Sequence, residues 1–182
     1  KKINTKSVIV IIDSDGEDNP KKINKLIHLA DKNPKTIITA NRLQRERSTL
    51  YKIFYKLHLL ITYILTGKYI DFGNFSAFNS KNLGQLFVNS DLFLAYSAAV
   101  AKNAKSIKPY YANKQKRYYG ESKVNIFFLL KHSINIISVF NSNVFKKSII
   151  LSIILGFAGF LMNNFIFYMP IIFIIIFNIF IN

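Results

Sequence analysis

The chain has 182 residues, of which 51% are apolar, and its 25 lysines and arginines against nine aspartates and glutamates give a net charge of +16. This apolar content excludes a disordered basic tail, while residues 148–182 contain no charged side chain and therefore exclude a purely water-soluble globule. The absence of cysteine excludes disulfides, thiolate metal sites and cysteine nucleophiles.

The chain begins with the pattern of an α/β domain. Residues 7–12 form a β-branched run typical of a strand buried on both faces. Pro20 opens a helix that continues to Asp31, and residues 35–40 form a second strand. A strand, a helix and a strand in succession predict a parallel crossover unit, whose best polar site is at the carboxyl end of the first strand.

The middle of the chain predicts more helices than strands. Hydrophobic periodicity indicates a long helix at 50–65, an extended segment at 69–76, two short helices within 81–104, a strand at 107–111 and an amphipathic helix at 122–140.

The end of the chain predicts membrane spans. Residues 148–168 fit one helix across a bilayer, which takes about 20 apolar residues, with Asn163 and Asn164 as its weak point. Pro170 then breaks the run, and residues 171–182 begin a second span that we expect to be truncated.

Charge near the first span predicts its orientation. Lys146 and Lys147 precede the span and, by the positive-inside bias, place the basic domain on the cytoplasmic side of the cell membrane. The protein is then a multi-pass membrane protein.

The residues with the clearest chemical potential follow the first strand. Asp13 and Asp15 are two positions apart at a strand end, where both carboxylates can face one divalent cation, and Mg²⁺ or Mn²⁺ prefers such oxygen ligands. Alternatively, residues 13–18 form an acidic turn that caps the following helix.

One family with such a strand and acidic motif is the haloacid-dehalogenase-like phosphatases. Asp13-x-Asp15-Gly16 resembles their first motif, although Glu17 stands where that family has threonine. The family also needs a late acidic pair, whereas the later acids of this chain are isolated: Asp71, Asp91 and Glu121.

The sequence more closely resembles the membrane-anchored branch of family-2 glycosyltransferases, similar to dolichyl-phosphate mannose synthases and other polyprenyl-phosphate glycosyltransferases. Residues 11–20 resemble its strand, Asp-x-Asp and acidic-proline helix start. The remaining motifs follow in order: 42–47 for its Arg-x-x-Arg segment, 51–55 for its aromatic helix, 66–76 for its Gly-Phe loop and 117–123 for its Arg-x-x-Gly-x-Ser-Lys signature.

The resemblance implies an α/β fold with a partial GT-A-like (Rossmann-like) domain at 1–120, amphipathic membrane-interface helices at 121–147 and a transmembrane region at 148–182. It implies transfer of a sugar, with inversion, from a nucleotide sugar to a lipid phosphate. Asp15 would hold the metal, and Asp13 the metal or the ribose. The residues implied in binding phosphate are Arg42, Arg45, Arg117, Ser122 and Lys123. A phosphate acceptor demands no general base.

Part of the family pattern is missing. The family's first strand, with a Pro-x-Tyr-Asn-Glu type motif that holds the nucleotide base, is expected upstream of Lys1. Since Lys1 is not methionine either, we expect the chain to be a fragment without its natural start and inactive by itself.

Other interpretations of the composition stay open as rivals. A basic, membrane-bound scaffold without catalysis is one alternative. Nucleic-acid binding is disfavoured, because the aromatic residues interleave with leucine and isoleucine as in helix packing. His28, His58 and His132 have no ligand or triad spacing and are expected to be structural or exposed. Homo-oligomerisation is left open.

Overall fold

The computed structural model describes residues 7–42, 49–86, 91–113, 115 and 125–181. Its four strands are β1 (Val8–Ile11), β2 (Ile37–Arg42), β3 (Phe72–Asn79) and β4 (Ile107–Ala112). Its helices are α1 (Ile23–Lys32), α2 (Thr49–Thr66), α3 (Leu83–Leu86), α4 (Asp91–Leu94), α5 (Tyr96–Asn103), α6 (Ile126–Val139), α7 (Asn141–Leu161) and α8 (Met169–Ile181). Short 3₁₀ turns are η1 (Pro20–Lys22), η2 (Ser80–Asn82) and η3 (Phe165–Tyr168). The protein therefore has the mixed α/β composition that the sequence predicts.

The four strands form one mixed sheet in the order β1-β3-β2-β4. β3 is antiparallel to both β1 and β2, so β1 and β2 run in the same direction, and β4 is parallel to β2. The expected crossover unit is therefore present, with β1 and β2 parallel to each other, but β3 lies between its two strands and makes the sheet mixed. The end of β2 and the start of β3 lie side by side, because Asn41 pairs with Phe72. β3 therefore runs in the direction opposite to β2. In the described part of the chain, no strand pairs with the outer edge of β1.

The pairing of β2 with β3 contains an irregularity. Thr39 pairs with Ser76 and Asn41 pairs with Phe72, so Ala40 alone on β2 faces the three β3 residues 73–75. Such a bulge bends a strand and re-aims its side chains. Pairing resumes on the other side of the bulge, where Phe72 at the start of β3 pairs with Asn41.

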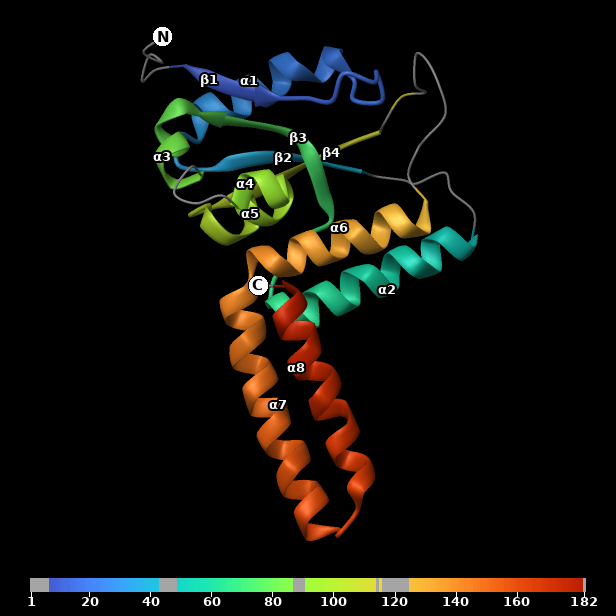
Figure 1. Ribbon diagram of the computed structural model, residues 1–182. Coiled ribbons are helices and arrows are strands. Elements are labelled where there is room, and N and C mark those ends of the chain that lie inside the picture. Colours follow the sequence, from blue (N-terminus) through green and yellow to red (C-terminus); the bar gives the residue numbers. More distant parts are fainter. Residues whose placement is uncertain (1–6, 43–48, 87–90, 114, 116–124, 182) are drawn as a thin grey trace.

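Both faces of the sheet are covered by helices (Figure 1). On one face, Leu26 and Ala30 of α1 pack on Ile38 and Ala77. On the other face, residues of α3 and α5 pack with β2 and β3: Ile37, Phe78, Leu86 and Val100. Burying a large apolar side chain completely contributes about 1.5–3 kcal/mol, so these two clusters hold the layers together. Residues of β1 contact both clusters but are only half-buried, so the expectation of a strand buried on both faces is met in part.

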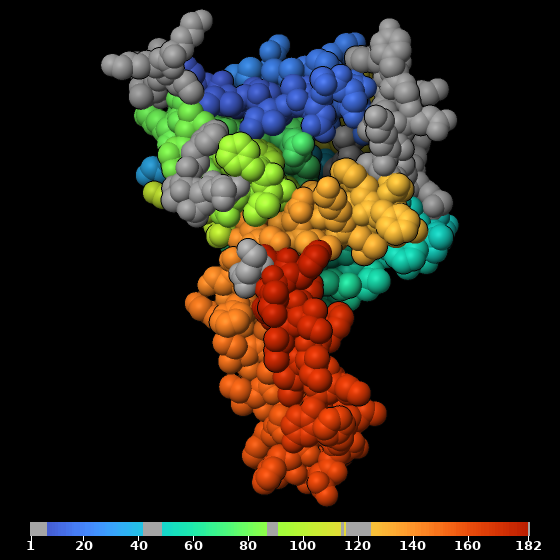
Figure 2. All heavy atoms as spheres, viewed as in Figure 1, coloured from blue at the N-terminus to red at the C-terminus, as the bar shows by residue number. Residues whose placement is uncertain are grey.

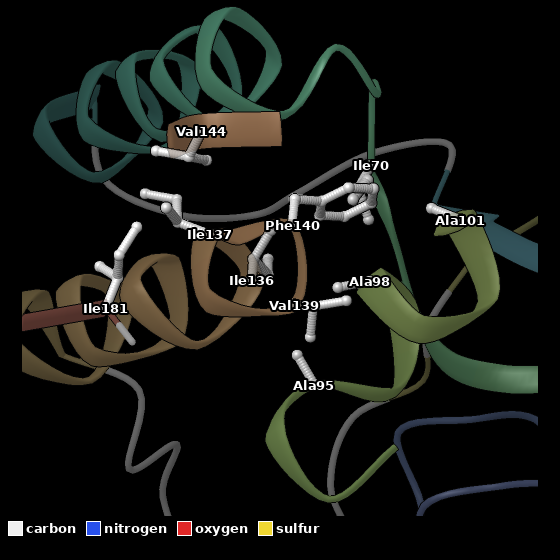
Figure 3. Packing of buried hydrophobic residues seen from close by; sticks show 10 residues of the cluster. All are labelled: Ile70, Ala95, Ala98, Ala101, Ile136, Ile137, Val139, Phe140, Val144 and Ile181. Atoms are coloured by element: carbon white, nitrogen blue, oxygen red, sulfur yellow. The ribbon is translucent and has the colours of Figure 1, made fainter. Parts of the chain in front are cut away.

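Helices α2 and α6 lie side by side beneath this layered part and join it to the rest of the molecule (Figure 1). A third cluster forms at the junction, where α5, α6, α7 and the end of α8 meet (Figure 3). Its core includes Ala98, Ile136, Phe140, Val144 and Ile181. Because residues far apart in sequence meet here, the junction is part of the folded core.

Helices α7 and α8 form an antiparallel hairpin that projects away from the sheet (Figures 1 and 2). The turn lies at Asn163, whose φ of 45° is left-handed, and at Asn164, whose side chain accepts a hydrogen bond from Ile166 N at 3.0 Å. The first helix thus covers 141–161 instead of 148–168, and Pro170 does not break the run, because it lies in the first turn of α8.

Helix α7 has the length and composition of a membrane span. Among the described helices, α7 is long and apolar enough to cross a membrane, and 17% of its most apolar window is buried inside the protein. With 21 residues it is about 31 Å long, against about 30 Å for the hydrocarbon core of a bilayer. Length and composition thus support the sequence-based expectation of one span.

Candidate active site

The acidic turn after β1 is closed by its own hydrogen bonds. Asp13 N donates to the buried Asp18 carboxylate at 3.3 Å, and Glu17 N donates to Asp15 Oδ1 at 3.0 Å. Gly16 has a φ of 79°, a left-handed value that glycine adopts without steric strain. These contacts fix the turn and leave Asp13 and Asp15 on the wall of a cleft.

Asn74 at the start of β3 holds Asp13. Its Nδ2 donates to Asp13 Oδ1 at 3.1 Å. The extended register of β1 with β3 explains this neighbourhood, because Ile11 pairs with Ser76 and Asp13 therefore lies opposite Asn74. The site is accordingly built by two strands of the sheet.

The cleft has a volume of about 560 Å³ and two chemically different walls. The sheet side carries Asp13, Asp15, Glu17 and Asn74. The opposite side is built by α2 and α6 and carries rings: Tyr51, Tyr55, His58, Phe128 and His132. A ligand in the cleft would therefore contact carboxylates on one side and aromatic or imidazole rings on the other.

The five rings are in contact along the wall. The ring centroids are 6.5 Å apart for Tyr51 and Tyr55, 5.7 Å for Tyr55 and His58, 6.2 Å for His58 and His132, and 6.3 Å for His132 and Phe128. Three rings come from α2 at helical spacing, and two come from α6. The ring wall therefore holds α2 and α6 together as well as lining the cleft.

The two histidines of the ring wall differ in their environments. His58 Nδ1 lies 2.6 Å from Ser133 Oγ, and Ser133 Oγ donates to the Leu129 carbonyl at 2.8 Å. Since a hydroxyl has one proton, the His58 Nδ1–H donates to Ser133. Burial lowers the pKa of His132 below its usual value, which favours the neutral ring at neutral pH.

The acidic wall fits a divalent cation whose ligands come partly from the protein and partly from a bound substrate. Among the described residues, no three histidine or acidic side chains converge as a complete metal site. Mg²⁺, however, is commonly bound through one or two carboxylates together with substrate phosphates and water. Asp13 and Asp15 supply that number of carboxylates at the cleft.

The phosphate-binding residues expected from the sequence lie largely outside the described residues. This holds for Arg45, Arg117, Ser122, Lys123 and the side chain of Arg42, although the backbone of Arg42 ends β2. Gln115 N donates to Glu17 O at 2.7 Å, and Asn125 Oδ1 accepts from Phe128 N at 2.8 Å at the start of α6. The described residues that flank the Arg117 motif therefore contact the acidic turn on one side and begin a cleft helix on the other.

Three contributions to the cleft are not evident in the sequence. His58 and His132 are 74 positions apart, and nothing in their spacing indicates that they meet. Asn74 faces Asp13 because of strand pairing, which the expected Gly-Phe loop at 66–76 does not show. The helical spacing of the aromatic residues and histidines within 50–65 and 122–140 could have suggested one ring-bearing face on each helix. It does not indicate that the two faces meet.

A second cavity of about 440 Å³ lies at the β2–β4 side of the same sheet face. Its polar part is a chain in which Thr39 Oγ1 donates to Asn41 Oδ1 at 2.8 Å and Asn41 Nδ2 donates to Asp71 Oδ1 at 2.6 Å. Asp71 is thus held away from the acidic turn, and Asp91 is paired with Lys102 at 3.0 Å. Neither acid lines the first cleft, so neither supplies the late acidic group of a phosphatase there.

No protein-family model matches the chain, and no curated protein or solved structure does. The geometry of the cleft and the sequence motifs are therefore the basis for a functional proposal.

Proposed function

We propose that the protein is a membrane-anchored glycosyltransferase that transfers a sugar, with inversion, from a nucleotide sugar to a lipid phosphate. The observation that carries the proposal is the position of Asp13 and Asp15, which face α2 and α6 across the cleft. These two helices lie at the base of the apolar hairpin. A soluble donor and a membrane-embedded acceptor could meet in such a cleft.

The exposed surface of the base supports a membrane location. Apolar residues of α2 follow one helical face and are exposed: Leu50, Ile53, Leu57, Leu60, Ile61 and Ile64. Ile126, Phe127 and Leu130 of α6 are exposed as well. Helices of this kind lie in the interface of a bilayer with their apolar side toward the lipid. We infer a multi-pass protein in the cell membrane, with its α/β part on the cytoplasmic side because Lys146 and Lys147 precede the apolar part of α7.

The chemistry follows from the two walls. Asp13 and Asp15 would hold Mg²⁺ or Mn²⁺, which stabilises negative charge on a leaving diphosphate. The bond between the anomeric carbon and the diphosphate oxygen breaks, and an oxygen of the lipid phosphate forms the new bond from the opposite face. Arg42, Arg45, Arg117, Ser122 and Lys123 are proposed to bind the phosphates.

The α/β part is proposed to be a portion of a GT-A-like domain. Its acidic turn follows a strand that contacts both apolar clusters, as in the glycosyltransferase motif. A sheet covered on both faces suits such a domain. The order of the motifs along the chain adds to this support. A homo-oligomer is compatible with the proposal and is not required by it.

The proposal is tested by metal-dependent binding. In detergent-solubilised complete protein, UDP-glucose and GDP-mannose are titrated with and without MnCl₂. We expect that one donor binds only with Mn²⁺, that Asp15→Asn abolishes this binding, and that Asp31→Asn on the exposed surface of α1 leaves it unchanged. Equal donor binding by Asp15→Asn would contradict the metal role.

A transfer assay separates the enzyme from its rivals. Membranes that contain the complete protein are supplied with a labelled nucleotide sugar and polyprenyl phosphate, and label is measured in the lipid fraction. A scaffold gives neither metal-dependent donor binding nor labelled lipid, and a phosphatase releases inorganic phosphate without transferring sugar.

A further inference from the structure

The bulge of β3 is stabilised from inside the protein. Ser76, which is fully buried, donates its hydroxyl proton to the Asn74 carbonyl at 3.0 Å. This bond lies within the bulge, in which residues 73–75 face Ala40 of β2. The side chain of Ser76 thus fixes the backbone of Asn74.

Tyr96 at the start of α5 fixes Ser76 in turn. Its hydroxyl lies 2.6 Å from Ser76 Oγ. Because the Ser76 proton is donated to the Asn74 carbonyl, the Tyr96 hydroxyl is the donor of this second bond. Burial raises the pKa of Tyr96, and this outweighs the lowering by the Ser76 hydrogen bond, so the donor proton is retained over the physiological pH range.

The last bond of the series reaches the acidic turn. Asn74 Nδ2 donates to Asp13 Oδ1, which requires the amide nitrogen, because the amide oxygen facing a carboxylate oxygen would be repelled. Three hydrogen bonds therefore connect a helix on one face of the sheet with a carboxylate on the wall of the cleft. Asn74 is exposed, whereas the two groups that fix it are largely buried.

We propose that Tyr96, Ser76 and Asn74 form a hydrogen-bonded relay that positions the Asp13 carboxylate for the divalent cation. The inference rests on the proposed function, since it takes Asp13 as a metal ligand. Hydrogen-bond partners of metal ligands orient the ligand, and their removal commonly weakens metal binding about 10- to 100-fold. Asn74, Ser76 and Tyr96 are positioning residues in this scheme.

Binding of Mn²⁺ alone to the complete protein in detergent tests the relay, with free Mn²⁺ measured by electron paramagnetic resonance. We expect Asn74→Ala to weaken Mn²⁺ binding about 10- to 100-fold. Tyr96→Phe removes one hydroxyl at the far end of the relay, and we expect a loss near the lower limit of that range, about tenfold. The matched controls Asn24→Ala, on the exposed side of α1, and Tyr110→Phe, on the opposite face of the sheet, retain the affinity of the unaltered protein.

The outcomes separate the relay from the metal role itself. If Asp13→Asn loses Mn²⁺ but Asn74→Ala binds it as the unaltered protein does, the relay is overturned and the proposed function stands. If Asn74→Ala is weakened and Tyr96→Phe is not, the part of the relay through Tyr96 is overturned. If the unaltered protein and Asp13→Asn bind Mn²⁺ equally, the metal role fails together with the relay. If neither binds Mn²⁺ alone, the same variants are compared with UDP-glucose or GDP-mannose present, and equal Mn²⁺ binding there overturns both.

A structural role of Tyr96 is distinguished by the readout. Loss of a buried hydrogen bond lowers the melting temperature, but it leaves the Mn²⁺ affinity of the folded protein unchanged unless Asp13 moves. Because Asn74 is exposed, Asn74→Ala tests the contact with Asp13 even if Tyr96→Phe prevents folding.

Discussion

The sheet and the hairpin use the same apolar residue types in opposite ways. Phe78 of β3 is 1% exposed between the sheet and its helices, whereas Phe157 of α7 is 62% exposed. In the layered part, α1 and the group α3–α5 exclude water from both sheet faces. In the hairpin, each helix covers only one side of the other, and we expect lipid to cover the rest. The protein thus covers the apolar residues of the sheet itself and leaves those of the hairpin largely exposed.

The junction between these regions also uses charge. Lys147 at the start of the hairpin donates to the Ile64 carbonyl in the last turn of α2 at 2.6 Å. Lys102 of α5 donates to the Val139 carbonyl at the end of α6 at 2.6 Å. Cations at helix C-termini are favourable, because the last carbonyls there have no partner in the helix. The comparison between the two regions can be tested by matched substitutions in each and at this junction.

The largest difference in stability is expected when a phenylalanine is replaced by alanine in the sheet and in the hairpin. Phe78→Ala leaves a cavity in the sheet and costs about 3–5 kcal/mol, whereas Phe157→Ala removes a ring that is 62% exposed and is expected to cost less. Hydrogen exchange of the β3 amides in detergent measures the effect. Similar losses of protection in both variants would show that the hairpin is packed like the sheet.

Introducing a charge should disturb the hairpin more than the surface of the α/β part. Ile154 of α7 is 58% exposed, and Ile154→Asp places a carboxylate where we expect lipid, at a cost of about 2.5–3.5 kcal/mol for insertion. Resistance to alkaline extraction from membranes measures insertion. Ile27→Asp on α1 is the control, and it is expected to stay membrane-bound. Full membrane retention of Ile154→Asp would argue against a bilayer-facing hairpin.

The hairpin turn offers a test of topology, because the chain contains no cysteine. If the hairpin crosses the bilayer, Asn163→Cys reacts with a membrane-impermeant maleimide on intact cells. Lys25→Cys on exposed α1 is expected to react only after permeabilisation. Labelling in the reverse order would place the α/β part outside the cell.

A smaller effect is expected at the junction. Lys147→Met removes the cation at the C-terminus of α2 and is expected to destabilise the protein by about 0.3–1 kcal/mol. Thermal unfolding followed by circular dichroism in detergent measures this change. Lys146→Met removes a neighbouring exposed charge and serves as the control. Equal melting temperatures for the two variants would show that the Lys147 contact adds nothing to stability.

The smallest effect concerns pH and the ring wall. Burial lowers the pKa of His132 in the folded protein below the usual value of about 6.5, so the unfolded chain binds more protons as the pH falls through that value. His132 therefore favours stability at higher pH and loses that contribution on acidification. We expect His132→Phe to reduce the loss of unfolding free energy between about pH 7.5 and about pH 5.5, whereas His28→Asn on exposed α1 does not. An unchanged pH dependence in His132→Phe would show that this ring is solvated.

Local patterns predicted much of the fold. The structure confirms four elements that short-range sequence signals predict. These signals are the β-branched run of β1, the proline before α1 and the helical spacing of α2 and α6. The position of β3 between β1 and β2 could not be obtained in this way, because it depends on the edge at which the chain re-enters the sheet.

The hairpin turn and the candidate site also depend on contacts that local sequence patterns do not predict. Asn163 and Asn164 stand out in the sequence as a weak point, but only the packing of α8 on α7 makes them a turn. The acidic pair is evident from its spacing. Its contact with Asn74 and its distance from the ring wall depend on pairings between remote segments, and the role of the acidic pair stays a prediction.

The outer edge of β1 is a place where a further strand would lie next to the cleft. Within the described residues, β1 hydrogen-bonds to β3 along one side only, and its residues Val8–Ile11 include no charge or proline that would discourage another strand. A strand that pairs there would have one end beside Asp13 and Asp15, which follow directly from β1. Any segment that docks at this edge would thus bring its terminal side chains to the acidic turn and become a further boundary of the cleft.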